Sequence, residues 1–205
     1  MILLVSGATA TVKRHRGRVG ELIVPGAGNA PDSLQLTPGR WAMDNGAFSD
    51  FNPGAFVAML ETYHRYQGCR FVAAPDRVAD AHLTLNQWPF WSRLIRGVGF
   101  VPALVAQDGL LPDMVPWAQL GALFIGGTTE WKLGPHAQTL ISLAKARGLW
   151  VHMGRVNSQR RIWDAARMGC DSFDGSGFSR WPDIRMPKGL QWADEATQAA
   201  QISLC

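Results

Sequence analysis

The 205-residue sequence has no apolar run long enough to cross a membrane and no segment that resembles a secretory signal. A membrane helix needs about 18 consecutive apolar residues, whereas the apolar start of this chain ends at Val5. Basic residues follow that start, which is the reverse of their order in a secretory signal. We therefore expect a globular protein of the cytoplasm (the host cytoplasm if a phage encodes it) with no membrane contact.

Patterns for metal binding and disulfide pairing are also missing. The three cysteines are widely spaced and form no CxxC pair, and the five histidines show no metal-ligand spacing. This usage predicts neither a disulfide framework nor a metal site.

Charged residues are sparse, at 18% of the chain, against 47% hydrophobic residues. Such a balance excludes a disordered chain. The net charge of +4 indicates little by itself, but the basic residues are clustered. The clusters lie at residues 13–18, 155–167 and 180–188 and are either solvated or in contact with nucleic-acid phosphates.

Short apolar runs, typical of buried parallel strands, alternate with segments of helical periodicity. The expected strands are Ile2–Ser6, Trp41–Asp44, Phe71–Pro75, Phe100–Ala106, Ala122–Ile125, Leu149–Met153 and Asp171–Asp174, with Leu22–Val24 as a weaker candidate. The expected helices are Pro53–Tyr66, Asp80–Ile95, Pro135–Arg147 and a segment from Asn157 or Ser158 to Met168.

This alternation predicts one α/β domain over residues 1–205, a compact or incomplete (β/α)8 TIM-type barrel. A typical barrel takes about 250 residues. A doubly wound open sheet is the alternative. It is disfavoured because residues 26–31 lack the third glycine and the helix of a nucleotide-binding turn.

Polar residues or glycines follow the successive strands at their carboxyl ends. They are Asp44, Asp76, Gln107, Gly126 with Gly127, the His152–Gly154 segment and Asp174. In a barrel these ends meet on the face that carries catalysis. The pattern therefore indicates a site at this face.

The residue types at these ends suit cleavage of a glycosidic bond. Asp44 and Asp174 come from separate strands and can divide the roles of nucleophile and general acid/base. Asp76 can accept two hydrogen bonds from adjacent N–H groups of a guanine edge. The Gln107 amide and the backbone N–H groups of Gly126 and Gly127 can donate to its carbonyl.

Two apolar residues beside these strand ends, Phe48 and Met153, are candidates to sandwich an aromatic base. Core packing is the commoner role for either residue alone.

Six segments, taken together in this order, resemble the tRNA-guanine transglycosylase superfamily. They are Met43–Phe48, Ala74–Asp80, Leu104–Gly109, Phe124–Gly127, Val151–Val156 and Gly169–Gly175. The similarity extends over roughly residues 41–183.

The resemblance implies a barrel enzyme that exchanges guanine in a nucleic acid for a free 7-deazaguanine base of the preQ0 type, without a cofactor. It implies that Asp174 is the nucleophile on C1′ and that Asp44 is the general acid/base. The base would be bound by Asp76, Gln107, Gly126 and Gly127 and stacked by Phe48 and Met153.

The sequence departs from the family in ways that bear on the polymer. The zinc subdomain of the tRNA enzymes is missing, the chain is short, Asn45 replaces a usual serine, and Gly175 and Ser176 follow Asp174 in place of a Pro-Thr-Arg segment. Short length without zinc is similar to the DNA-modifying branch, the DpdA-type enzymes of phages and bacterial islands. DNA is therefore expected over tRNA.

Phosphate contacts are expected from basic residues along one nucleic-acid strand. They are Lys13, Arg14, Arg16, Arg18, Arg155 and Arg180. The sequence leaves a homodimer open.

Three other functions stay open. A glycine-rich segment, residues 126–129, can hold the phosphate of a small metabolite in a barrel enzyme. A non-catalytic nucleic-acid-binding protein and a glycosylase that releases the base to water are the others.

Overall fold

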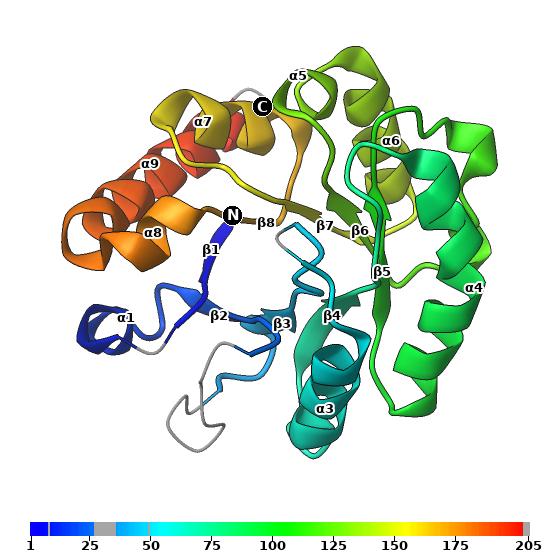
Figure 1. The fold of residues 1–205 in the computed structure, drawn as a ribbon. Helices are drawn as coiled ribbons and strands as arrows, with labels where there is room; N and C mark the ends of the chain where they lie inside the picture. The colour runs from blue at the N-terminus through cyan, green and yellow to red at the C-terminus, as the bar shows by residue number, and fades with distance from the viewer. Residues whose placement is uncertain (8, 27–35, 49, 203–205) are drawn as a thin grey trace.

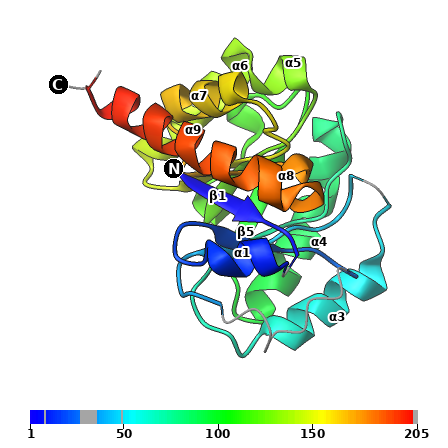
Figure 2. The ribbon, with the colours of Figure 1, turned by 90° about the vertical axis from the view of Figure 1, so that its left-hand side faces the viewer.

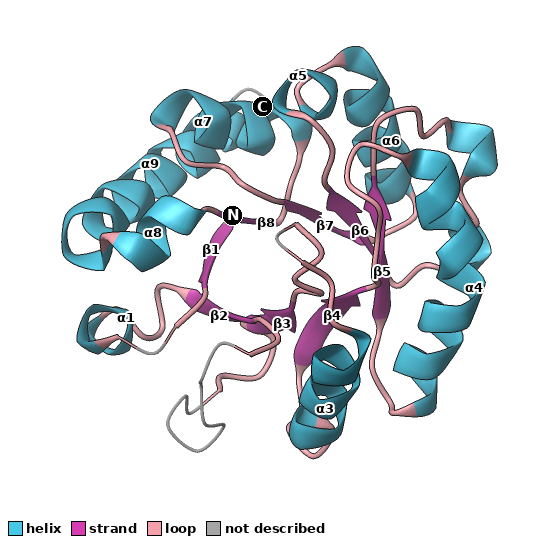
Figure 3. Ribbon diagram, in the orientation of Figure 1, coloured by secondary structure: helices cyan, strands magenta, loops and turns pink. Residues whose placement is uncertain are grey.

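The computed structural model describes residues 1–7, 9–26, 36–48 and 50–202, and its centre is a closed barrel of eight parallel strands (Figures 1 and 3). The strands are β1 (Ile2–Val5), β2 (Gly20–Ile23), β3 (Trp41–Met43), β4 (Cys69–Ala73), β5 (Pro102–Ala106), β6 (Ala122–Ile125), β7 (Trp150–Met153) and β8 (Ser172–Asp174). Each strand pairs with the next, and β8 pairs with β1. The predicted (β/α)8 barrel is confirmed, and it is closed rather than incomplete.

Helices surround the barrel and connect most strands. They are α1 (Ala10–Arg14), α3 (Pro53–Tyr63), α4 (Ala81–Gly97), α5 (Thr129–Lys132), α6 (Pro135–Ala146), α7 (Gln159–Met168), α8 (Ser176–Arg180) and α9 (Pro182–Ile202), with short 3₁₀ helices η1 (Pro112–Met114) and η2 (Trp117–Gln119). Helix α9 runs outside β1 and packs against α1, α7 and α8 (Figure 2). No helix in the described ranges is both long and apolar enough to span a bilayer.

Side chains alternate between the two sides of each strand, as the period of two requires. The barrel interior is filled by Leu4, Leu22, Ala42, Phe71, Ala73, Ala103, Val105, Ala122 and Phe124. The intervening residues, such as Met43, Leu123 and Phe173, pack outward under the helices. Several alanines in the interior leave room for the two phenylalanine rings.

The predicted strands lie within two residues of the observed ends, and the weak candidate at residues 22–24 is the full strand β2. Helix starts follow their caps: the side chain of Asp80 accepts from the Leu83 amide, and that of Ser158 accepts from the Arg161 amide. Helix α4 continues through Gly97 rather than stopping at residue 95.

Helices α1, α5, α8 and α9 have no counterpart among the predicted elements. The first three have four or five residues each, too short for a helical period to show. Helix α9 contains Pro187, a residue that usually ends a helix. The loop expected to lack a nucleotide-binding turn, residues 26–31, lies outside the described residues from 27 onward.

Candidate active site

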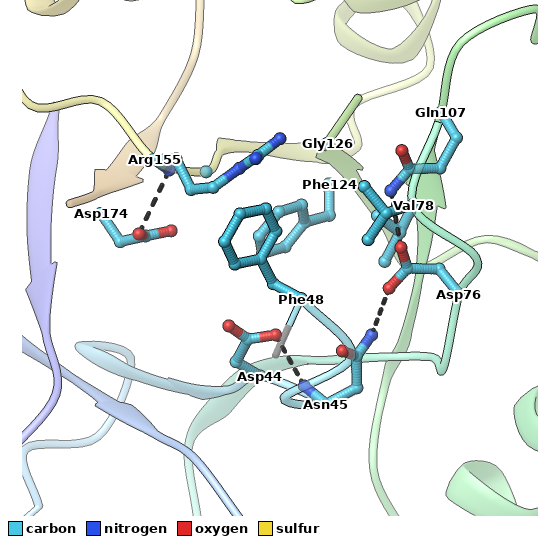
Figure 4. Close-up of a pocket in the computed structure, with 12 residues that line it drawn as sticks. Asp44, Asn45, Phe48, Asp76, Val78, Gln107, Phe124, Gly126, Arg155 and Asp174 are labelled. Atoms are coloured by element: carbon cyan, nitrogen blue, oxygen red, sulfur yellow. Dashed lines mark hydrogen bonds between the residues drawn. The ribbon is translucent and has the colours of Figure 1, made fainter. Parts of the chain in front are cut away.

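A pocket opens at the carboxyl end of the barrel, with a volume of about 440 Å³ including its mouth (Figure 4). Its lining consists of Asp44, Asn45, Phe48, Asp76, Val78, Val105, Gln107, Phe124, Gly126, Gly154, Arg155 and Asp174. The strand pattern explains part of this set. Asp44, Gln107 and Asp174 stand two residues beyond interior positions of β3, β5 and β8, so they continue the inward-facing side.

Asp76 lies on one side of the pocket between two amide side chains. Asn45 Nδ2 donates to Asp76 Oδ1 at 2.7 Å, and Gln107 Nε2 donates to Asp76 Oδ2 at 2.6 Å. The Asp76 pKa is raised by burial, while both hydrogen bonds and the charge of Arg155 act in the opposite direction. The two carboxylate oxygens have four lone pairs in all, and the bonds from Asn45, Gln107 and the Asp76 amide do not use all of them.

The Gln107 amide is oriented by the backbone. Its Oε1 accepts from the amides of Ala79 at 2.8 Å and Gly127 at 2.9 Å. This assigns Nε2 to the pocket side, where one of its two hydrogens is used by Asp76. The second hydrogen has no acceptor among the described residues, so it remains for a ligand.

The two glycines after β6 do not act as predicted. The Gly126 N–H donates to the Ala106 carbonyl and the Gly127 N–H donates to Gln107, so neither is left for a base carbonyl. Gly126 contributes space instead: a Cβ there would lie 2.6 Å from Gln107 Nε2. Gly127 does not line the pocket, but its N–H orients the Gln107 side chain.

Asp174 lies on the opposite side, with a nitrogen atom close to each of its carboxylate oxygens. The Arg155 amide donates to Oδ1 at 3.2 Å, and His152 Nε2 lies 3.0 Å from Oδ2. Arg155 has a φ of +58°, a strained conformation for a residue with a side chain, of the kind found at functional sites.

Asp44 lies across from Asp174 and is partly buried. Burial and the negative charges of Asp174 and Asp76 raise the pKa of Asp44 to about 7, against the opposing effect of hydrogen bonds from the Asn45 and Gly46 amides. A carboxyl group with a pKa near neutrality suits proton transfer.

Phe48 covers the mouth of the pocket and is 66% exposed, with the Arg155 guanidinium 4.4 Å from its ring centroid. Arg155 also donates to the Gly127 carbonyl. The prediction that Met153 stacks on the base is wrong: Met153 is fully buried in the outer core. Phe124, at an interior position of β6, supplies the apolar wall.

Lys132, at the end of α5, is a buried cation beside this pocket. Its Nζ donates to the Gly154 carbonyl at 2.6 Å. Burial and the Arg155 charge lower the Lys132 pKa to about 8, although Asp174 acts to raise it. Lys132 thereby fixes the loop that carries Arg155.

The first basic cluster lies among acidic residues of the same chain. Arg14 pairs with Asp183 at 2.9 Å and Arg18 with Asp194 at 2.6 Å. The charges of Lys13 and Arg16 act on Glu21, whose pKa is raised by burial to about 7.

Arg18 is at the opposite end of the barrel from the pocket. Its carbonyl accepts from Arg40, just before the start of β3. Arg180 is exposed at the end of α8, beside a contact between Ser6 and Ser179 that ties α8 to the carboxyl end of β1.

Four residues of the lining were not predicted from the sequence: Asn45, Val78, Val105 and Phe124. His152 and Gly154 were placed at this face, but neither was given a role in the site. Alternation along β6 and β7 was the available signal, because it places Phe124 and His152 inward and Met153 outward. Within the described ranges, no three histidine, cysteine, aspartate or glutamate side chains are arranged to hold a metal ion.

The fold is similar to those of three solved structures. They are the BexX/CysO complex of Amycolatopsis orientalis (TM-score 0.57, 14% identity, 97% of this chain and 90% of that chain), the 3-hexulose-6-phosphate synthase from Salmonella typhimurium (0.58, 13%, 98% and 100%) and a designed cube-shaped protein cage (0.53, 15%, 98% and 73%). At these identities the likeness shows the fold alone. No protein-family model and no curated protein matches the sequence.

Proposed function

We propose that this chain is a base-exchange glycosyltransferase that replaces guanine in DNA with a 7-deazaguanine through a covalent aspartyl intermediate. One observation supports it most: Asp76 and Gln107 form a hydrogen-bonding edge complementary to guanine, and two carboxylates lie across the same pocket.

The edge has two acceptors followed by one donor. Asp76 offers its carboxylate oxygens as acceptors, and Gln107 offers its second Nε2 hydrogen. Guanine presents two donors, N2–H and N1–H, followed by the O6 acceptor, which matches this order. Adenine presents an acceptor at N1 and does not match.

The two aspartates then divide the chemistry. A carboxylate oxygen of Asp174 forms a bond to C1′ while the C1′–N9 bond breaks, and the electron pair leaves with guanine. Asp44, protonated at the start, gives its proton to the leaving base. The incoming 7-deazaguanine transfers its N9 proton to Asp44, and N9 displaces Asp174 from C1′.

A base within a duplex does not reach a pocket of this depth, so the target guanine is flipped out or already unpaired. Phe48 and Phe124 offer apolar surface to its faces. The choice of DNA over tRNA rests on the resemblance to the DNA-modifying branch.

The test offers oligodeoxynucleotide and tRNA separately, each carrying labelled guanine, together with candidate 7-deazaguanines. We expect label release from DNA, incorporation of the deazaguanine, and a denaturant-stable complex between protein and DNA when no incoming base is present. Asp174→Asn should abolish all three, and retention of exchange by that variant would refute the nucleophile assignment. An abasic product with no incorporation would identify a hydrolytic glycosylase.

A barrel enzyme for a small phosphorylated metabolite is the second candidate. It is favoured by the similarity to a protein described as 3-hexulose-6-phosphate synthase. Most donors of the loop expected to hold the phosphate are engaged: the Gly126 and Gly127 amides bond within the barrel end, and both the amide and the hydroxyl of Thr128 donate to Asp108, at 2.7 and 2.6 Å. A rise in melting temperature with sugar phosphates and not with guanine would favour this candidate.

A further inference from the structure

His152 lies below the pocket floor, inside the barrel, and its exposed fraction is 0%. The rings of Phe124 and Phe71 pack against the imidazole, with centroid distances of 4.5 and 5.3 Å. A histidine in an apolar interior needs a partner for each ring nitrogen. Both partners are present, and one of them is Asp174.

The contacts form a chain that ends at Asp174. Trp150 Nε1 lies 2.9 Å from Ser172 Oγ, the same oxygen lies 2.9 Å from His152 Nδ1, and His152 Nε2 lies 3.0 Å from Asp174 Oδ2. All members come from β7 and β8, at interior positions. Strand pairing between His152 and Ser172 fixes their relative position.

The donor inventory gives the chain a direction. An indole N–H only donates, so Trp150 occupies a lone pair of Ser172. The Ser172 hydroxyl hydrogen then has one hydrogen-bond acceptor in the described structure, His152 Nδ1. An imidazole that accepts at Nδ1 carries its proton on Nε2 and donates it to the carboxylate.

We propose that His152 is a positioning residue for Asp174, set by Ser172 and Trp150 to present Nε2–H to Oδ2. With the Arg155 amide on Oδ1, both carboxylate oxygens are then held. This fixes the plane of the carboxylate and directs its remaining lone pairs toward the pocket. A nucleophile held in the attacking geometry avoids the entropic cost of orientation during reaction.

The proposal deepens the assignment of Asp174 as nucleophile and rests on the proposed base exchange. Its first test does not involve catalysis. In protein with ¹⁵N-labelled histidine, we expect the His152 signals to show a bare Nδ1 and a protonated Nε2. Ser172→Ala should produce a mixture of tautomers, and Asp174→Asn should shift the Nε2 signal. A protonated Nδ1 with a bare Nε2 would overturn the proposal.

The second test measures single-turnover release of labelled guanine. His152→Leu, which has no donor, should lower the rate about 100-fold, and Ser172→Ala about 10-fold, by analogy with the losses of about 10–100-fold for groups that orient metal ligands. KM for the oligonucleotide should stay unchanged. His152→Gln, whose amide can donate toward Asp174, should release guanine about 10-fold faster than His152→Leu.

His136 is an exposed histidine at the start of α6, and His136→Gln serves as the matched control with an unchanged rate. Melting temperatures show whether each variant folds. If His152→Leu does not fold, Ser172→Ala still tests the proposal. Equal rates for folded His152→Leu and the wild type would overturn the positioning role. No guanine release by the wild type, with the expected ¹⁵N signals, would refute the base exchange and leave the hydrogen-bonded chain supported.

Discussion

At the scale of single residues, the two candidate catalytic carboxylates have different surroundings. Asp174 accepts the Arg155 amide at Oδ1, and His152 Nε2 lies 3.0 Å from its Oδ2. Asp44 accepts the Asn45 amide at 2.7 Å but faces two other carboxylates, which together with burial raise its pKa to about 7. Paired acidic groups whose environments differ in this way divide into a charged partner and a proton carrier.

Because its pKa is raised, the Asp44 carboxylate lowers the free energy of unfolding at neutral pH. Its unfolded pKa is about 3.9, so between about pH 4 and pH 7 the folded state binds more protons than the unfolded state. The free energy of unfolding therefore falls as the pH rises through this window. Asp44→Asn removes the charge and keeps an oxygen for the Asn45 amide, so it should raise the melting temperature more at pH 7.5 than at pH 4.5.

Each gain of 1 kcal/mol in the free energy of unfolding should raise the melting temperature by about 2–4 °C for a chain of this size. Thermal denaturation at the two pH values measures the effect. Asp113→Asn, at an exposed carboxylate of η1, is the control and should show no such difference. An equal gain for Asp44→Asn at both pH values would contradict the raised pKa.

At the scale of elements, the strand ends determine which side chains meet. The sequence was sufficient to predict that Asp44, Asp76, Gln107 and Asp174 lie on one face, because parallel strands in a barrel share their direction. It did not determine the use of the Gly126 N–H, because the hydrogen bond to Ala106 depends on the register between β5 and β6.

The wrong prediction that Met153 stacks on the base has a different cause, which lies in the alternation of side chains along β7. A side chain two positions from an inward residue also faces inward, and His152 and Trp150 follow this rule on β7. Met153 has the opposite parity and packs under the helices. The chemistry of methionine favours stacking on a base, but the alternation along the strand directs this side chain away from the pocket.

The end of β6 packs so closely on β5 that a methyl group there would disturb the base-binding edge. A Cβ at Gly126 would lie 2.6 Å from Gln107 Nε2, 2.9 Å from Val105 Cγ1 and 3.1 Å from the Ala106 carbonyl oxygen. The Gln107 amide is the part that can move, since the other two belong to the barrel wall. Gly126→Ala should therefore fold but bind guanine at least 10-fold more weakly, consistent with an overpacking cost of about 1–3 kcal/mol.

Isothermal titration with guanine, beside thermal denaturation, measures this effect. Gly54→Ala in α3 is the matched control, because its Cβ would contact only Asn52 Oδ1, at 3.4 Å. Its guanine affinity should equal that of the wild type. Wild-type affinity in Gly126→Ala would show that the position of Gln107 does not set base binding.

At the scale of the whole molecule, the repeated spacing of apolar runs was enough to predict the barrel, whereas the distribution of charge was not predictable from clusters along the chain. Residues 13–18 form a basic run in the sequence. In the fold, Arg14 and Arg18 face acidic residues of α9, which are more than 160 positions away. Such pairing depends on where α9 packs, and no local pattern contains that information.

This distribution predicts which end of the barrel binds a nucleic-acid strand. Arg180 is exposed near the carboxyl ends of β1 and β8, on the side of the pocket, whereas Arg18 is paired with Asp194 at the other end. Arg180→Gln should weaken binding of single-stranded DNA equally for all sequences. It should also reduce the slope of log affinity against log salt by about 0.7, the value for one phosphate contact.

Arg18→Gln should leave both affinity and slope unchanged and alter stability by less than about 1 kcal/mol, as for an exposed ion pair. Fluorescence anisotropy with a labelled oligonucleotide, measured over a salt series, separates the two variants. A reduced slope in Arg18→Gln with none in Arg180→Gln would place the strand at the amino end of the barrel, away from Asp44 and Asp174. Binding there would be incompatible with base exchange in this pocket, because the nucleotide to be exchanged must reach both aspartates.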